Sequence, residues 1–403
     1  MIKILILFLI TTTIASAYKR EANPFKIVNN IRYSLNMNTL RPNQYLEKSA
    51  KNHARYLKIN NIIAHVEDSS RRGFTGERSA DRAKAAGYKT KFVSENLSAG
   101  SGEHTGIKSV EGLMSAIYHR FGFLAFDINE MGYGKEGGIH VYNMGNSKIN
   151  KLCKRPKKAS VREPSIKICN SETPISYNKY KKVRFSLMRS NPKMVIFPKD
   201  EQKNIPPAFY EEAPDPLPGY SVSGYPISIS FNESYFPSQI QMREFYIRDV
   251  RHQKVKLIKH RDGNTIFSKK TDPNGHLSGL EFAIFPEKRL DYNAIYYVRV
   301  KYIYRGSVRR KQWSFKTKRI KNLKIIKNEK NIRLRLNRTN NIYFTPKSKT
   351  DRGVSSFSYR CSSDKIKFER LDMHTLRITN KYQKKLIKCT FKVERKTYSL
   401  ILK

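Results

Sequence analysis

Residues that could bind a metal or transfer protons are gathered in the first third of this chain. Ten candidates lie between residues 53 and 119: His53, His65, Glu67, Glu77, Asp81, Glu95, Glu103, His104, Glu111 and His119. Both kinds of chemistry need imidazoles and carboxylates that converge from separate elements. His53 falls on the same helical face as Ala50 and Leu57, so we interpret it as a packing residue. His104 lies in the glycine-punctuated stretch GSGEHTGIKS, which predicts a solvent-exposed loop.

The elements that must position these side chains are mixed helices and strands within residues 24–145. Apolar residues recur every three or four positions over 46–57, which predicts an amphipathic helix. Further helices are expected at 76–86 and 109–120. The glycine-rich run MGYGKEGGIHVYNMGN predicts a β-hairpin. Because no βαβ rhythm is repeated, we expect an α+β architecture, such as an αβα sandwich.

Four stretches of this region, taken in order, resemble the CAP superfamily of cysteine-rich secretory, antigen 5 and pathogenesis-related proteins, in its exported bacterial branch. They are NNIRYSLNMNTLRPNQYLEKSAKNHARYL followed by AH, then GYKTKFVSENLSAG, LMSAIYHRF and MGYG. The resemblance covers about residues 24–145, and the order and spacing of the stretches carry it. It implies an αβα sandwich with a wide cleft, in which two histidines and two acidic residues converge.

The resemblance assigns three members of that tetrad to this sequence. His65 matches the first histidine, Glu95 the acid of the Glu-Asn motif and His119 the second histidine. Ala116 occupies the position of the second acid, and Glu111 is the nearest substitute. Glu111 precedes His119 by eight residues, about 80° around one helix, which permits convergence. His65, His119 and Glu95 would suffice as three zinc ligands with a fourth position open, so Zn²⁺ is the cofactor expected.

Neighbouring polar residues are interpreted as scaffold. Arg82 is expected to pair with a buried carboxylate, Gly87 to end a helix and Asn96 to make hydrogen bonds in a loop.

The composition changes twice after residue 150. Residues 151–224 hold a cysteine pair and then a proline- and glycine-rich stretch, which predicts a disulfide-strapped extension and a linker. Residues 225–318 predict an immunoglobulin-like β-sandwich with Trp313 in its core. The runs that favour its strands are YPISISFN, EFYIRDV, KVKLIKHRD, LEFAIFP, AIYYVRVKYIY and KQWSFKTK. Residues 319–403 alternate similarly and predict a small basic β domain, so the chain is expected to be α+β followed by all-β domains.

The cysteines form two pairs that are far apart in the sequence. Local pairing, Cys153 with Cys169 and Cys361 with Cys389, is the simplest of the three disulfide schemes. Neither pair has the short spacing of a zinc clip. A Cys361–Cys389 bond would stabilise the small last domain by about 3 kcal/mol.

The N-terminal MIKILILFLITTTIASAYKR has the pattern of a signal peptide. Lys3, an apolar stretch and Ala15-Ser16-Ala17 predict that residues 1–17 are removed before Tyr18. The apolar stretch is shorter than the roughly 20 residues of a membrane span, and no later segment is long and apolar enough. We therefore expect a secreted or periplasmic protein.

The chain is strongly basic, with a net charge of +46. Export argues against nucleic acid as a partner. Lys and Arg are spread along the whole chain, which favours a solvated surface, although residues 319–403 hold 24 Lys and Arg against 6 Asp and Glu. An anionic cell-wall polymer or lipid surface is therefore the alternative partner. The sequence indicates no oligomeric state.

Three functions remain open. The first is a binding module for an envelope component, lipid or divalent metal. The second is a metal-assisted or acid–base hydrolase of peptide or cell-wall bonds, although Ser94 and Ser98 lack the Gly-x-Ser-x-Gly setting of a nucleophile. The third is a structural spacer with a vestigial cleft, which the alanine at position 116 favours.

Overall fold

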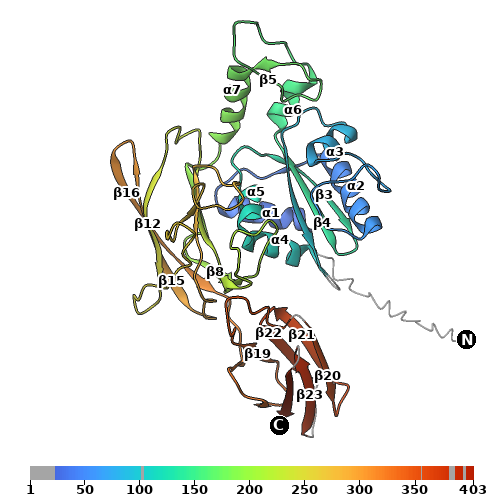
Figure 1. Cartoon of the computed structure of the whole chain (residues 1–403), viewed down its shortest axis with the longest axis vertical. Helices are drawn as coiled ribbons and strands as arrows, with labels where there is room; N and C mark the ends of the chain where they lie inside the picture. Colours follow the sequence, from blue (N-terminus) through green and yellow to red (C-terminus); the bar gives the residue numbers. More distant parts are fainter. Residues whose placement is uncertain (1–22, 101–103, 355, 381–385, 394–395) are drawn as a thin grey trace, which may run out of the picture.

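The computed structural model describes residues 23–100, 104–354, 356–380, 386–393 and 396–403. Within them the chain forms an N-terminal domain of helices and strands, a helical extension and two β-sandwiches in sequence (Figure 1). The predicted signal peptide lies outside the described residues. None of the helices in the described part of the chain is long and apolar enough to cross a membrane.

The N-terminal domain is an αβα sandwich, as the sequence predicts. Its sheet has the order β1-β3-β4-β2. The strands are β1 (Arg41–Pro42), β2 (Val93–Ala99), β3 (Glu130–Glu136) and β4 (Ile139–Gly145). One face is covered by α2 (Gln44–Asn60) and α3 (Ser79–Ala86), and the other by α1 (Pro24–Ser34), α4 (Gly106–Ser115) and α5 (Ile117–Phe123) (Figure 1). β3 and β4 form the predicted hairpin.

The helix predicted at 109–120 is wrong as a single element. Ala116 adopts an extended backbone, with φ −76° and ψ 122°, and ends α4 while it starts α5. A residue outside the helical region breaks the regular rotation from one residue to the next. The angle calculated between Glu111 and His119 therefore does not apply.

The extension that follows the N-terminal domain is helical and cross-linked. It contains α6 (Ser147–Lys154), the short strands β5 (Ser165–Ile166) and β6 (Ile175–Ser176), and α7 (Tyr177–Met188). The predicted Cys153–Cys169 disulfide is present and packs in an apolar cluster with Ile149 and Ile175. The disulfide therefore fastens the loop between α6 and β6 to the first helix of the extension.

The first β-sandwich begins earlier than predicted. Its sheets have the orders β13-β14-β11-β7 and β12-β15-β16-β8. The strands are β7 (Met194–Phe197), β8 (Gln202–Ile205), β11 (Ile227–Phe231), β12 (Gln241–Arg248), β13 (Phe267–Ser268), β14 (Glu281–Ile284), β15 (Ile295–Tyr304) and β16 (Ser307–Thr317). The boundary at residue 225 is thus corrected to Met194. The prolines that suggested a linker lie at 206–218, after β7 and β8, and both of these short edge strands are free of proline.

One of the six runs expected to form strands in this sandwich does not. KVKLIKHRD makes isolated bridges, Arg248 with Lys254 and Leu257 with Pro286, and β13 takes the sheet edge instead. Ile258 from this run is nevertheless buried in an apolar cluster with Phe267 and Phe285. The apolar residues of this run therefore pack onto the sandwich without forming a sheet strand. Trp313 lies in the core, as expected, against Phe245.

The last domain is a second sandwich with the strand order of the first. Its sheets are β17-β19-β22-β21 and β18-β24-β23-β20. The strands are β17 (Leu323–Ile326), β18 (Asn331–Leu334), β19 (Asn340–Phe344), β20 (Phe357–Cys361), β21 (Ile366–Asp372), β22 (Thr375–Asn380), β23 (Ile387–Val393) and β24 (Lys396–Leu402). The predicted Cys361–Cys389 disulfide joins directly paired residues of β20 and β23. No repeat is visible in the sequence, so the likeness is architectural.

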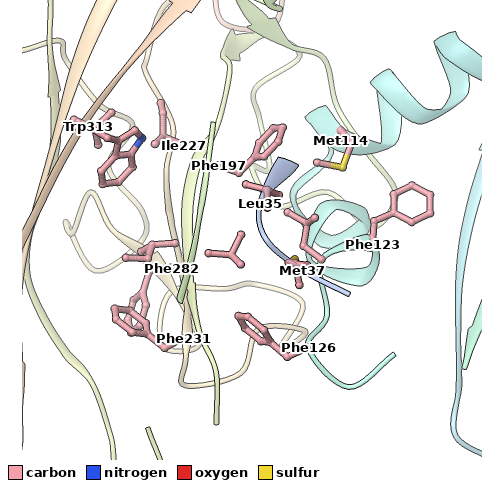
Figure 2. Packing of buried hydrophobic residues seen from close by; sticks show 14 of the residues in the cluster. Leu35, Met37, Met114, Phe123, Phe126, Phe197, Ile227, Phe231, Phe282 and Trp313 are labelled. Atoms are coloured by element: carbon pink, nitrogen blue, oxygen red, sulfur yellow. The ribbon is translucent and has the colours of Figure 1, made fainter. Parts of the chain in front are cut away.

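A continuous apolar core joins the N-terminal domain to the first sandwich. One buried cluster contains Leu35, Met37, Met114, Phe123 and Phe126 from the N-terminal domain together with Phe197, Ile227, Phe231, Phe282 and Trp313 from the sandwich (Figure 2). Arg120 is buried at the same boundary, where it donates to the carbonyl of Pro226 over 2.7 Å. The two domains are therefore packed as one unit.

Residues 206–222, which we call the junction segment, contact all three domains. Phe209 and Leu217 are buried against the first sandwich, in the cluster that also includes Ile117 of α5. Tyr210 donates to Asp372 of the second sandwich over 3.1 Å. β9 (Ala208–Phe209) pairs with β10 (Ser223–Gly224) and closes the segment into a loop. The stretch interpreted as a linker is therefore packed against the domains at several points.

Candidate functional site

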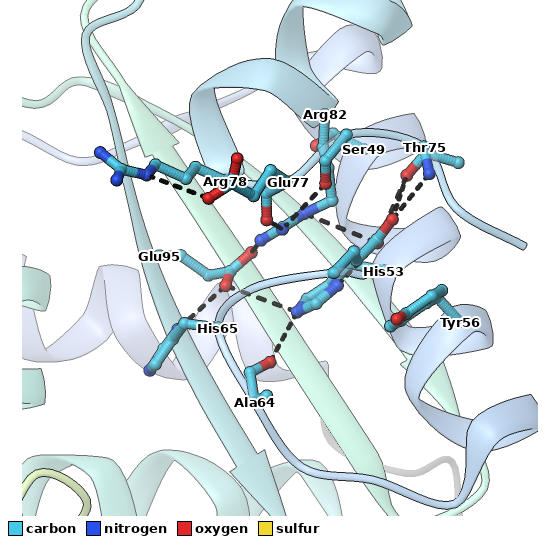
Figure 3. A network of polar contacts seen from close by, with 12 residues as sticks. Ser49, His53, Tyr56, Ala64, His65, Thr75, Glu77, Arg78, Arg82 and Glu95 are labelled. Atoms are coloured by element: carbon cyan, nitrogen blue, oxygen red, sulfur yellow. Dashed lines mark hydrogen bonds and ion pairs between the residues drawn. The ribbon is translucent and has the colours of Figure 1, made fainter. Parts of the chain in front are cut away.

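A buried polar network lies between α2, α3 and β2 (Figure 3). Arg82 of α3 donates to Glu95 Oε2 of β2 over 2.7 Å. His53 of α2 has Nδ1 2.8 Å from Glu67 Oε1 and Nε2 3.0 Å from the carbonyl oxygen of Ala64. The side chains of His53, Glu67 and Arg82 are fully buried. Buried charges persist only where they are paired and hydrogen-bonded, and here each has such a partner.

This network corrects the interpretation of His53 as a packing residue. Both of its ring nitrogens face oxygen acceptors, a carboxylate and a carbonyl. Both bonds form together when both nitrogens carry protons, and the charges of His53 and Arg82 then balance those of Glu67 and Glu95. The expected role of Arg82 as the partner of a buried carboxylate is confirmed.

Glu95 connects the network to the surface through His65. His65 Nδ1 lies 3.0 Å from Glu95 Oε1, and the His65 side chain is 44% exposed. With its amide nitrogen turned towards Glu95, Asn143 donates to Oε2 over 3.0 Å. Burial opposes ionisation of Glu95, but the hydrogen bond from His65 and the charge of Arg82 outweigh it, so the pKa of Glu95 lies below its usual value.

His119 is held by a carboxylate from outside the N-terminal domain. Its Nδ1 lies 2.9 Å from Glu212 Oε2, and Glu212 belongs to the junction segment. The Glu212 side chain is 2% exposed, and its other oxygen accepts from the backbone amide of Ile117 at the start of α5. Asn96 of β2 donates to the carbonyl oxygen of His119 over 2.8 Å, so Asn96 acts from a strand rather than from a loop.

Glu212 therefore takes the role that the sequence suggested for Glu111. Glu111 is exposed on α4 and makes no hydrogen bond or ion pair within the described residues. Sequence reasoning missed Glu212 because it lies 93 residues from His119, in a segment interpreted as linker. The available signal was the acidic pair Glu211-Glu212 in a strongly basic chain.

The two pairs bring His65 and His119 face to face. Their ring centroids are 6.2 Å apart, and the ring planes differ by 28°. Each ring contacts a buried carboxylate through Nδ1, which leaves the opposite nitrogen, Nε2, for another partner. Metal-binding histidines characteristically hold a carboxylate with the ring nitrogen that does not bind the metal.

The zinc site expected from the sequence, with His65, His119 and Glu95 as three direct ligands, does not form. Within the described part of the chain, no group of three or more His, Cys, Asp or Glu side chains is arranged to hold a metal. Both oxygens of Glu95 already have partners, so Glu95 lies behind His65 rather than beside it. The donors present fit coordination by two imidazoles, with Glu95 and Glu212 orienting the rings.

A second histidine cluster lies apart from this pair. His104 is partly buried rather than exposed, with Nε2 2.7 Å from Ser98 Oγ and its ring 5.1 Å from that of His140. Burial, together with the neighbouring charge of His140, lowers the pKa of His104 and favours its neutral form.

Comparison with known proteins agrees with the fold of the N-terminal domain. Residues 25–143 match CAP, the Cysteine-rich secretory protein family. No curated protein matches the chain. An extracellular protein containing an SCP domain from Bacillus anthracis is similar at 21% identity and a TM-score of 0.28, over 30% of this chain and 39% of that one. An outer surface protein from Borrelia burgdorferi is similar at 21% identity and a TM-score of 0.26, over 30% of this chain and 88% of that one.

Both solved structures are too distant to support an argument about function. The match covers less than half the length of the Bacillus anthracis protein. The family match, the αβα layers and the paired histidines agree on one assignment. Residues 25–143 of this chain form a CAP domain of the Cysteine-rich secretory protein family.

Proposed function

We propose that this protein is an exported binding protein whose CAP domain binds a divalent metal ion such as Zn²⁺ through Nε2 of His65 and His119. The observation that carries the proposal is the pairing of both rings, through Nδ1, with the buried carboxylates of Glu95 and Glu212. This arrangement fixes the tautomer in which Nε2 has the free lone pair.

Two imidazoles leave further coordination positions of a tetrahedral ion unfilled. Oxygen or nitrogen donors of an envelope component would fill them, so the metal would link the protein to its ligand. Binding is favoured over nucleophilic catalysis because, among the described residues, no Ser, Thr or Cys side chain is hydrogen-bonded to His65 or His119.

Calorimetric titration of the full chain with Zn²⁺ tests this proposal. His65→Ala and His119→Ala should each abolish binding, because one remaining imidazole holds zinc only weakly. His252→Ala, which removes an exposed histidine of the first sandwich, serves as the control and should bind like the wild type. Zinc binding that survives both cleft substitutions, or no binding at micromolar zinc in the wild type, would contradict the proposal.

The hydrolase remains the second candidate, because a carboxylate-held imidazole is also the arrangement of a general base. Turnover of labelled peptide or cell-wall substrates, lost in His119→Ala, would favour it. The spacer hypothesis loses its support, because it rested on the alanine at position 116, and Glu212 now supplies the second carboxylate.

A further inference from the structure

A strongly basic groove runs beside the connection between the two sandwiches. Its volume is about 570 Å³, and it lies between residues 318–322 and the sheet that contains β19, β21 and β22. The charged side chains that line it are Lys318, Arg319, Lys321, Arg338, Arg377 and Glu369. Five cations and one carboxylate make the groove attractive to anions even by the standard of this basic chain.

The floor of the groove is a row of side chains on three neighbouring strands. Arg377 of β22 pairs with Asn341 of β19 on one side and with Glu369 of β21 on the other. Directly paired residues of neighbouring strands lie on the same face of a sheet. The closest Arg377–Glu369 ion-pair contact, from NH1 to Oε2, is 3.6 Å, so the guanidinium is only loosely held.

Two atoms in this row are buried without a hydrogen-bond partner. They are Nε of Arg377, a donor, and Oδ1 of Asn341, an acceptor. Asn341 is 4% exposed, and its amide nitrogen donates to the carbonyl oxygen of Lys321 over 2.7 Å, which fixes the amide orientation. Each buried polar atom without a partner costs free energy, so a ligand that supplied a partner to both atoms would gain affinity in this groove.

Such a ligand must satisfy a donor and an acceptor at once. The arginines suit an oxyanion such as phosphate, which accepts paired hydrogen bonds from a guanidinium. Oδ1 of Asn341 requires a group that donates a hydrogen bond, and a hydroxyl provides one. A simple inorganic anion lacks this second feature, whereas a phosphorylated polyol has both.

We propose that this groove binds a phosphorylated polyol, with the phosphate against Arg377 and Arg338 and a hydroxyl donated to Asn341. Such groups occur in soluble polyol-phosphate polymers and in the headgroups of anionic lipids. The site lies in the second sandwich and does not require the histidine pair. It deepens the proposed function by naming an envelope component that the protein holds, and it uses different residues.

Binding of the full chain to poly(glycerol phosphate) tests the groove, with neutral dextran as the negative probe. The double variant Arg338→Gln/Arg377→Gln should weaken binding by at least about tenfold, because charge-assisted hydrogen bonds are among the stronger polar contacts. The matched control, Arg360→Gln/Lys392→Gln, removes the same charge from exposed positions of β20 and β23 and should cost less than about threefold. Equal losses in the two double variants would overturn the proposal.

Competition and vesicle measurements define the ligand. Glycerol 3-phosphate should displace the polymer at lower concentration than inorganic phosphate, and equal potency would refute the hydroxyl contact. Phosphatidylglycerol vesicles replace the polymer in a parallel arm. Binding to vesicles alone, still lost in the groove variant, assigns the phosphate to lipid. Zinc titration of the groove variant should match the wild type, so a failure here is distinct from a failure of the cleft.

Discussion

Among single residues, Glu95 is the one on which the candidate site depends most. One of its oxygens faces His65 and the other accepts from Arg82. The same carboxylate therefore orients a surface imidazole and neutralises a buried guanidinium. Function and stability are coupled at this position.

Glu95→Gln should destabilise the fold by about 3–5 kcal/mol, the usual cost of leaving one partner of a buried ion pair alone. The pKa of Glu95 is lowered in the folded protein, so its ionisation stabilises the fold above the unfolded-state value of 4.5 and this contribution is lost as pH falls through the folded value. Unfolding by denaturant, followed between neutral and acidic pH, should show a smaller acid loss in the variant than in the wild type.

Glu77→Gln is the matched control, since Glu77 is exposed and lies 3.8 Å from its nearest cation, Arg78. It should change stability by less than about 0.5 kcal/mol. A wild-type-like stability for Glu95→Gln would mean that the buried network does not hold the domain together.

At this scale the sequence named three of the four residues of the two pairs and missed Glu212. His65, Glu95 and His119 come together as the family resemblance implied, and Arg82 has the carboxylate expected of it. Glu212 could not be predicted, because helical and strand periodicity report which face of an element is buried, not which distant segment covers it. The polar contacts of His53 could not be predicted, because its spacing from Ala50 and Leu57 places it on the apolar face of the helix.

At the scale of elements, edge strands account for most of the differences from expectation. Central strands such as β11 and β15 have strong apolar patterns and were predicted. β7 and β8 are four-residue strands at sheet edges, and both fall within residues 151–224, which the sequence analysis assigned to an extension and linker. The helix break at Ala116 was missed for another reason: alanine is a strong helix former, and packing of Ala116 against the first sandwich overrides that preference.

The Cys361–Cys389 disulfide should stabilise the second sandwich as a separate element. It closes a separation of 28 residues, for which chain entropy predicts about 3–4 kcal/mol. Cys361→Ser/Cys389→Ser should therefore lower the thermal transition of this sandwich while zinc binding at the histidine pair stays unchanged. Reduction of the wild type should give the same shift. An unchanged transition in the variant would show that the sandwich core suffices without the cross-link.

At the scale of the whole molecule, the CAP domain is not self-contained. Its apolar face continues into the core of the first sandwich, and its second carboxylate arrives on the junction segment. Two residues before Glu212, Tyr210 contacts Asp372 of the second sandwich. The segment thus connects the histidine pair to the domain that carries the basic groove, and the site belongs to the full chain.

The zinc affinities of Glu212→Gln and Glu111→Gln decide whether Glu212 orients His119 for metal binding. Loss of a carboxylate that orients a metal-binding histidine typically costs 10–100-fold in affinity, so Glu212→Gln should weaken Zn²⁺ binding by about that factor. Glu111→Gln removes the same charge from an exposed position of α4 and should leave the affinity unchanged. Loss of affinity in Glu111→Gln with wild-type binding in Glu212→Gln would contradict the account.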